Sequence, residues 1–160
     1  MATEAKLRQL ADKGCPVYYF YSSERYLVRQ AITAITRILT ADSDEDATVL
    51  DGAAPEIEQL IMAAGTISFF GTCRVVVLPE LDPAAYSDKD LEELCSTLAS
   101  LENAVVVLGS VFELERNKLK TGKRAQKLIA ECKKLGFVEE LSKPKPYELK
   151  MMLIERAKAH

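Results

Sequence analysis

The chain has 160 residues, of which 48% are hydrophobic, so it is long enough to bury one sizeable core. A net charge of −3 gives no overall attraction to nucleic acid or to anionic membranes, and no apolar run is long enough to span a membrane. The N-terminus has no apolar signal core, so we expect a cytoplasmic protein with reduced thiols. The cysteines form no CxxC pair and the one histidine is terminal, which argues against a zinc site.

The first third of the chain predicts helix, strand and helix. A helix is expected over residues 3–13, and the continuous apolar and aromatic run 17–21 is typical of a strand buried on both faces. Ser22 and Ser23 are candidate N-caps for the next helix, with Glu24 in its first turn. Apolar residues then recur at helical spacing as far as Leu39. This order is half of a βαβ unit.

The middle of the chain predicts a second strand, helix and strand. After the acidic loop 42–46, which we interpret as solvated, residues 47–51 form a short strand candidate. Pro55 fits the first position of a helix and Gly65 fits its left-handed stop. The apolar run 74–78 is the next strand.

The last third continues the alternation. Ser87 begins a helix by a capping-box-like pattern, and residues 104–108 form another apolar strand. A helix near 124–135 and a strand over 137–141 follow. The whole pattern predicts an α/β fold in three layers, with a mostly parallel, five-stranded sheet.

A proline-containing linker at 143–146 predicts a domain boundary. Residues 147–159 begin another helix with nothing after it on which to pack. We therefore expect one domain over 1–142, and in 143–160 the linker and first helix of a second domain that is truncated here.

The turn after the first strand is where a P-loop protein holds phosphates on backbone N–H groups. Here that turn, residues 22–26, has no glycine, no lysine and a carboxylate at Glu24. The pair Gly122-Lys123 fails too, because Asn117 stands where the first glycine of the motif belongs. We expect no bound nucleotide or other cofactor.

Other catalytic chemistry is equally unsupported. Glu80 and Asp82 follow a strand, where a carboxylate could hold Mg²⁺, but we interpret them as capping or solvated acids. The terminal His160 excludes a Ser/His/Asp triad. The sequence predicts no catalytic residue and no metal ligand, and hence a protein that is not an enzyme.

One segment, 116–134, is basic. It could follow a phosphate backbone, or it could be a solvated helix face, and the absence of aromatic residues among its cations argues against base stacking. The cations that form the candidate DNA-proximal patch are Arg116, Lys118, Lys120, Lys123, Arg124 and Lys127.

Between Gly65 and Gly71, three large apolar side chains lie on one short connection: Ile67, Phe69 and Phe70, with Ser68 among them. They could all point into the core. Alternatively, one or two of them could be exposed as a wedge for a partner.

Several motifs, taken together, resemble those of one family. They are Lys13–Tyr21 leading to Glu24 and Tyr26-Leu27, then Leu50-Asp51-Gly52, Ser68–Gly71 before Arg74–Val77, and Lys145–Leu149. In this order they resemble the N-terminal domain of the delta subunit of the bacterial DNA polymerase III clamp loader, over nearly the whole chain. Ser22-Ser23 departs from the family pattern of a glycine and an acid.

The resemblance implies a P-loop NTPase-like, AAA+-like fold that does not hydrolyse ATP, in a non-catalytic subunit of a DNA-directed DNA polymerase assembly. Such subunits bind the ring-shaped sliding clamp (the beta subunit) and hold it open for loading onto primed DNA during DNA replication. Other loader subunits would bind the C-terminal region that is missing here, and primed DNA would be contacted only indirectly. The family's clamp-binding element matches Ile67, Ser68, Phe69 and Phe70, which favours the exposed wedge. The alternatives are a degenerate P-loop nucleotide-binding domain and a DNA-binding module that uses the basic segment.

Overall fold

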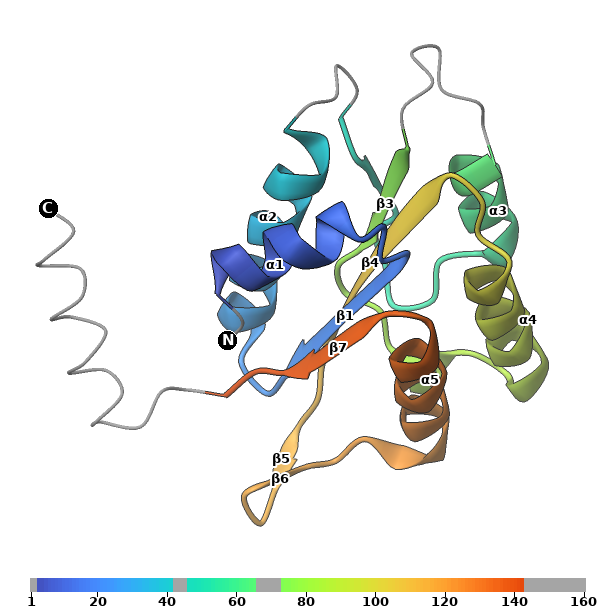
Figure 1. The fold of residues 1–160 in the computed structure, drawn as a ribbon. Coiled ribbons are helices and arrows are strands. Elements are labelled where there is room, and N and C mark those ends of the chain that lie inside the picture. Colours follow the sequence, from blue (N-terminus) through green and yellow to red (C-terminus); the bar gives the residue numbers. More distant parts are fainter. Residues whose placement is uncertain (1–2, 42–45, 66–72, 143–160) are drawn as a thin grey trace, which may run out of the picture.

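The strands form where the sequence has continuous β-branched and aromatic runs, and they assemble into one sheet (Figure 1). The computed structural model describes residues 3–41, 46–65 and 73–142. In their order across the sheet, the strands are β2 (Thr48–Val49), β3 (Arg74–Leu78), β4 (Ala104–Val111), β1 (Val17–Ser22) and β7 (Phe137–Glu140). Every pairing in this sheet is parallel, so the predicted α/β fold is confirmed.

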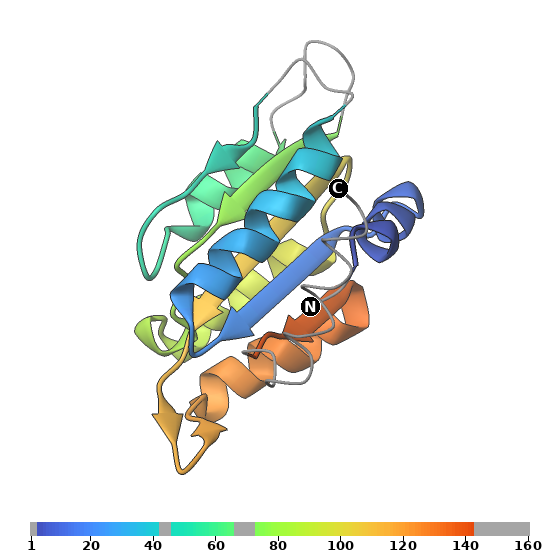
Figure 2. The same cartoon turned by 90° about the vertical axis from the view of Figure 1, so that its left-hand side faces the viewer.

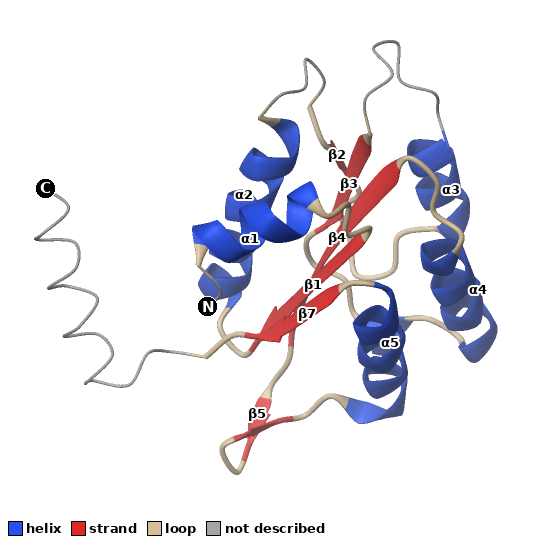
Figure 3. Ribbon diagram, in the orientation of Figure 1, coloured by secondary structure: helices blue, strands red, loops and turns tan. Residues whose placement is uncertain are grey.

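Helices cover both faces of the sheet and give the three layers expected from the sequence (Figure 3). On one face lie α1 (Glu4–Asp12) and α2 (Arg25–Thr40). On the other face lie α3 (Ile57–Gly65), α4 (Asp88–Ala99) and α5 (Gly122–Leu135). A short 3₁₀ helix, η1 (Pro83–Ala85), precedes α4. Among the described residues, no helix is both long and apolar enough to cross a membrane.

The central strand β1 supplies side chains to both halves of the core. Tyr18 and Phe20 pack with α1 and α2, whereas Val17 and Tyr19 pack with the helices of the opposite face. All four are fully buried. Burial of each such side chain contributes about 1.5–3 kcal/mol, so this short run accounts for much of the attachment of the two helical layers.

Close approach of β7 to β1 depends on a glycine. Gly136, which ends α5, lies so near the backbone of Val17 that a Cβ atom there would overlap the Val17 carbonyl. The glycine therefore allows α5 to end directly beside β1, and β7 pairs with β1 from Tyr18↔Phe137 onwards.

Three predicted helix ends were wrong. The second helix begins at Arg25 with Glu24 as N-cap, and the Ser22 hydroxyl accepts a hydrogen bond from the Glu24 N–H (3.1 Å) instead of capping the helix. The third helix begins at Ile57, because Pro55 is buried in the connection before it and its carbonyl accepts a hydrogen bond from the Tyr86 hydroxyl. Gly65 is the last residue of that helix and has no positive φ.

Two further differences lie in the last third. The strand expected over 104–108 extends to Val111, and a two-stranded antiparallel hairpin follows it, formed by β5 (Leu114–Glu115) and β6 (Lys118–Leu119). The hairpin turn has positive φ angles at Arg116 and Asn117, and asparagine is one of the residues that tolerate this conformation. The predicted N-cap Ser87 is confirmed, because its hydroxyl accepts a hydrogen bond from the Asp90 N–H. The predicted domain boundary and the segment 143–160 lie outside the described residues.

Candidate functional site

In a parallel sheet, all strands begin at one edge and end at the other; we call these the amino edge and the carboxyl edge. Ligands of open α/β folds bind outside the carboxyl edge, where neighbouring strands lead their chains in opposite directions. Here β1 lies between β4 and β7, so this position is the turn after β1. A phosphate or metal site of this fold would therefore lie at the turn after β1.

The turn after β1 is tied to its neighbours by the backbone. The Ser22 carbonyl accepts a hydrogen bond from the Phe112 N–H (2.8 Å), and the Tyr21 carbonyl accepts one from the Leu141 N–H (2.8 Å). Ser22 itself is fully buried. The Glu24 N–H donates a hydrogen bond to the Ser22 hydroxyl, and the turn has no glycine that would let its backbone approach a phosphate closely.

Behind this turn, α2 packs against β4 with no free space. A Cβ atom at Gly109 would lie 2.5 Å from Ile32 Cδ1, 2.7 Å from Val28 Cγ1 and 2.8 Å from the Pro79 carbonyl oxygen. The glycine thus brings the helix, the strand and the connection after β3 into direct contact at the carboxyl edge.

A buried polar chain fixes the same connection. Ser110 Oγ donates a hydrogen bond to the Leu81 carbonyl (2.7 Å), which leaves the Tyr19 hydroxyl as the donor to Ser110 Oγ (2.6 Å). Burial raises the pKa of Tyr19 well above its usual range, whereas the hydrogen bond to Ser110 lowers it. The arrangement satisfies each buried group, so its role is to hold the connection after β3 against β4.

The two strand-end acids are engaged as the sequence suggested. Glu80 Oε1 lies 3.0 Å from Arg25 Nη1 and 3.4 Å from Arg29 Nη2, both on the first turns of α2. Asp82 caps η1 by accepting a hydrogen bond from the Ala84 N–H. Glu80 therefore forms ion pairs in the position from which a carboxylate could otherwise hold Mg²⁺.

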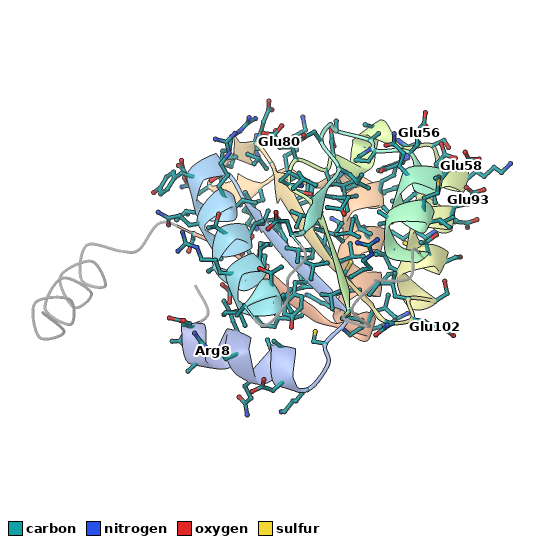
Figure 4. The ribbon with its side chains drawn as sticks, turned by 90° about the horizontal axis from the view of Figure 1, so that it is seen from above. Arg8, Glu56, Glu58, Glu80, Glu93 and Glu102 are labelled. Carbon is teal, nitrogen blue, oxygen red and sulfur yellow. The ribbon has the colours of Figure 1, made fainter. Side chains whose placement is uncertain are left out.

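Other acids gather elsewhere. Seen from above, Glu56 just before α3, Glu58 on α3 and Glu93 on α4 lie together, whereas Glu80 lies beside α2 (Figure 4). Within the described residues, no group of three or more His, Cys, Asp or Glu side chains is arranged to hold a metal ion.

The cysteines do not form a reactive pair. Cys95 and Cys132 are buried, and burial raises the pKa of both thiols. Cys15 and Cys73 precede β1 and β3, which are separated by β4. Both of these thiols are free.

The structure divides the basic segment. Arg124 and Lys127 on α5 pair with acids of α4, Asp88 (3.0 Å) and Glu92 (3.4 Å). The other four cations are exposed on or beside the hairpin: Arg116, Lys118, Lys120 and Lys123. Both acidic partners are on α4, outside the segment 116–134. Counting the charges within that segment alone therefore overstated the number of cations without an acidic partner.

The predicted wedge residues Ile67, Ser68, Phe69 and Phe70 lie outside the described residues. Their connection begins after α3 and ends before β3, so both of its ends are at the amino edge. On the last turns of α3, Ile61 is 52% exposed and Met62 is 72% exposed. Helical spacing predicts Ile61 on the buried stripe of this helix, and that prediction is wrong; the sequence did not single out Met62.

Comparisons with known proteins show a likeness in fold. No family model and no curated protein sequence matches the chain. A matching solved structure is that of a DNA polymerase III, gamma subunit-related protein from Thermotoga maritima, with a TM-score of 0.61 and 15% sequence identity. The match covers 91% of this chain and 48% of that protein, so the chain spans about half the length of the protein it resembles. At this identity the comparison establishes the fold: a parallel five-stranded α/β sheet of the kind found in that polymerase-related protein.

Proposed function

We propose that the chain is part of a non-catalytic clamp-loader subunit of a bacterial replicase, which binds the sliding clamp through Ile67, Ser68, Phe69 and Phe70 and holds the ring open. The observation that carries this proposal is the fold match. The sequence motifs resemble the delta subunit of DNA polymerase III, and the solved structure with the same fold is named for the same polymerase.

The closed carboxyl edge supports a role without nucleotide chemistry. The turn after β1 has no glycine, its Glu24 N–H donates to the Ser22 hydroxyl, and Arg25 and Arg29 hold the Glu80 carboxylate. A subunit built this way would act by binding alone. Any nucleotide control of the ring would then come from neighbouring subunits.

The elements that flank the wedge support a role in binding a protein. The helix α3 ends and the strand β3 begins at the amino edge, and Ile61 and Met62 near the end of α3 have exposed side chains. Burial of a Phe or Ile side chain in a partner contributes about 1.5–3 kcal/mol, and a few such anchors carry most of the binding energy in many interfaces. A partner with a preformed apolar pocket could thus be held tightly through three side chains. If the chain binds the open clamp more tightly than the closed clamp, binding raises the fraction of open rings, to an extent set by the difference between the two affinities.

Alanine substitutions at the wedge test the proposal. We expect Phe69→Ala or Phe70→Ala to weaken binding to a purified sliding clamp by about 1 kcal/mol or more, measured by surface plasmon resonance. Tyr26→Ala is the matched control, because Tyr26 is an exposed aromatic residue on α2 at the opposite edge of the sheet. If both Phe variants bind the clamp as tightly as the unsubstituted chain, the proposal is wrong.

The alternatives from the sequence predict different results. A degenerate nucleotide-binding domain would show a raised melting temperature with millimolar ATP and Mg²⁺, and we expect no shift. A DNA-binding module would show salt-dependent affinity for DNA in fluorescence anisotropy. We expect weak binding at most, because two of the six cations are paired with α4.

A further inference from the structure

The β5–β6 hairpin projects beyond the carboxyl edge of the sheet, next to the first turns of α5 (Figure 2). A groove with a volume of about 420 Å³ lies between the hairpin and α5, and the ends of β1 and β7 complete its lining. This volume is within the range of about 300–1,000 Å³ that is typical of ligand sites, so the groove can hold more than one side chain of a partner.

Part of the lining is apolar. Leu119 of the hairpin, Ile129 of α5 and Tyr21 of β1 all line the groove and are only partly buried. Ala130, also on α5, lines the same groove and is exposed. A partner that covers these side chains would therefore remove apolar surface from water, which favours binding.

Cations flank the apolar lining on both walls. Lys118 on the hairpin and Lys133 on α5 line the groove. Three further exposed cations lie on or beside the hairpin: Arg116, Lys120 and Lys123. Within the described part of the chain, none of these five side chains forms an ion pair. An apolar centre with a cationic rim is complementary to a protein segment that carries carboxylates around apolar side chains.

A nucleic acid fits this groove less well. Glu140 lines the groove, and Glu115 lies opposite Lys118 in the hairpin register, so acids interrupt the row of cations that a phosphate backbone would follow. Bases stack on available aromatic rings, but the Tyr21 ring already packs edge-to-face against Tyr19 and Phe112. These features favour a peptide over a nucleic acid as the occupant.

We propose that the groove between the β5–β6 hairpin and α5 binds an acidic peptide segment of a partner protein. Carboxylates of the peptide pair with Lys118 and Lys133, and one or two of its apolar side chains lie between Leu119 and Ile129. The proposal gives a role to the cations of the basic segment that do not pair with α4. It concerns the carboxyl edge, opposite the wedge, and does not depend on clamp binding.

Fluorescence anisotropy with the 160-residue chain tests the proposal. The probe is a fluorescein-labelled peptide in which leucines are spaced among aspartates, Asp-Asp-Leu-Asp-Asp-Leu-Asp-Asp. We expect saturable binding with a Kd below about 1 mM. Two comparison peptides should bind more weakly, one with asparagine in place of aspartate and one with serine in place of leucine. No saturable binding of the probe, or equal binding of either comparison peptide, would overturn the proposal. So would a single-stranded DNA of the same charge that binds as tightly as the probe.

Charge substitutions locate the peptide. Lys118→Glu and Lys133→Glu place an acid on each wall, and Ala130→Glu adds one on α5; all three positions are exposed, so an unchanged melting temperature is expected. Each variant should weaken binding of the probe by about tenfold or more, because like charges then face each other. Lys89→Glu is the matched control, since Lys89 is exposed on α4 and does not line the groove. Unchanged binding in the three groove variants, or an equal loss in Lys89→Glu, would overturn the proposal.

Discussion

The two edges of the sheet differ in how far their side chains are buried. At the carboxyl edge, Leu81 is buried and Tyr19 and Ser110 form a closed hydrogen-bonded chain behind the turn after β1. At the amino edge, the last turns of α3 leave Ile61 and Met62 exposed. The centre of the carboxyl edge, around β4 and the start of α2, is thus filled, whereas α3 presents exposed apolar side chains at the amino edge.

The difference teaches that a parallel α/β sheet can keep its topology while the centre of its carboxyl edge is filled. Closing the carboxyl edge required only small residues and paired charges: Gly109 beside α2, and Glu80 between two arginines. None of these changes disturbs the order of the strands. The following predictions test how firmly the carboxyl edge is closed.

The largest effect is expected from Gly109→Ala. The added methyl group would approach the Pro79 carbonyl oxygen to 2.8 Å as well as two side chains of α2, and a backbone atom cannot move aside as a side chain can. Overpacking of this kind costs about 1–3 kcal/mol in the free energy of unfolding, measured by urea denaturation. Gly65→Ala, at the amino edge, is the control: nothing lies within 4 Å of its added Cβ, so we expect little change or a slight gain. Equal free energies for the two variants would contradict the tight packing at Gly109.

A smaller effect, dependent on pH, is expected from Tyr86→Phe. The Tyr86 hydroxyl donates a hydrogen bond to the Pro55 carbonyl (2.6 Å), and burial raises its pKa from 10.0 to about 12. The Tyr86 phenol ionises less readily in the folded state than in the unfolded state. The contribution of the neutral phenol to the free energy of unfolding is therefore complete below pH 10 and is lost as pH rises from 10 to 12. At pH 8 the variant should lose about 1 kcal/mol, and the decline in its free energy of unfolding above pH 10 should be shallower.

Chemical denaturation at pH 8 and pH 11 measures both quantities. Tyr26→Phe, at a tyrosine that is 48% exposed, serves as the control and should follow the unsubstituted chain. A decline above pH 10 as steep in Tyr86→Phe as in the unsubstituted chain would rule out a contribution from Tyr86.

The smallest effect is expected from Glu80→Gln. The carboxylate pairs with Arg25 and Arg29, but all three side chains are 42–66% exposed, and exposed pairs contribute about 0.2–1 kcal/mol. We expect a loss within this range at low salt that shrinks in 1 M NaCl, measured by urea denaturation. A loss that is independent of salt would mean that Glu80 stabilises the edge by something other than charge.

Much of the fold could be predicted because the strands are buried on both faces. The runs at 17–21, 74–78 and 104–108 are continuous and apolar, and that pattern is typical of a parallel sheet covered by helices. The order of strands and helices then leaves few possible topologies. The hairpin at 114–119 was missed because two-residue strands leave too short a pattern to detect.

The carboxyl edge was predicted in part. Asp82 was correctly interpreted as a capping acid. The absence of a bound nucleotide, which follows from the lack of glycine and lysine after β1, stays a prediction. The partners of Glu80, and the pairing of Arg124 with Asp88, could not be predicted, because they join helices and loops that are distant in sequence. The wedge at the amino edge remains a prediction.

The central place of β1 has a consequence for how the protein is made. Its strand, Val17–Ser22, is synthesised well before its two neighbours in the sheet, β4 and β7. Until those segments are synthesised, an apolar aromatic stretch has no permanent partner. Strand pairings between segments distant in sequence form slowly, and apolar surface stays exposed until they form. The nascent chain should therefore depend on chaperones at this stage more than a protein with local strand pairings would.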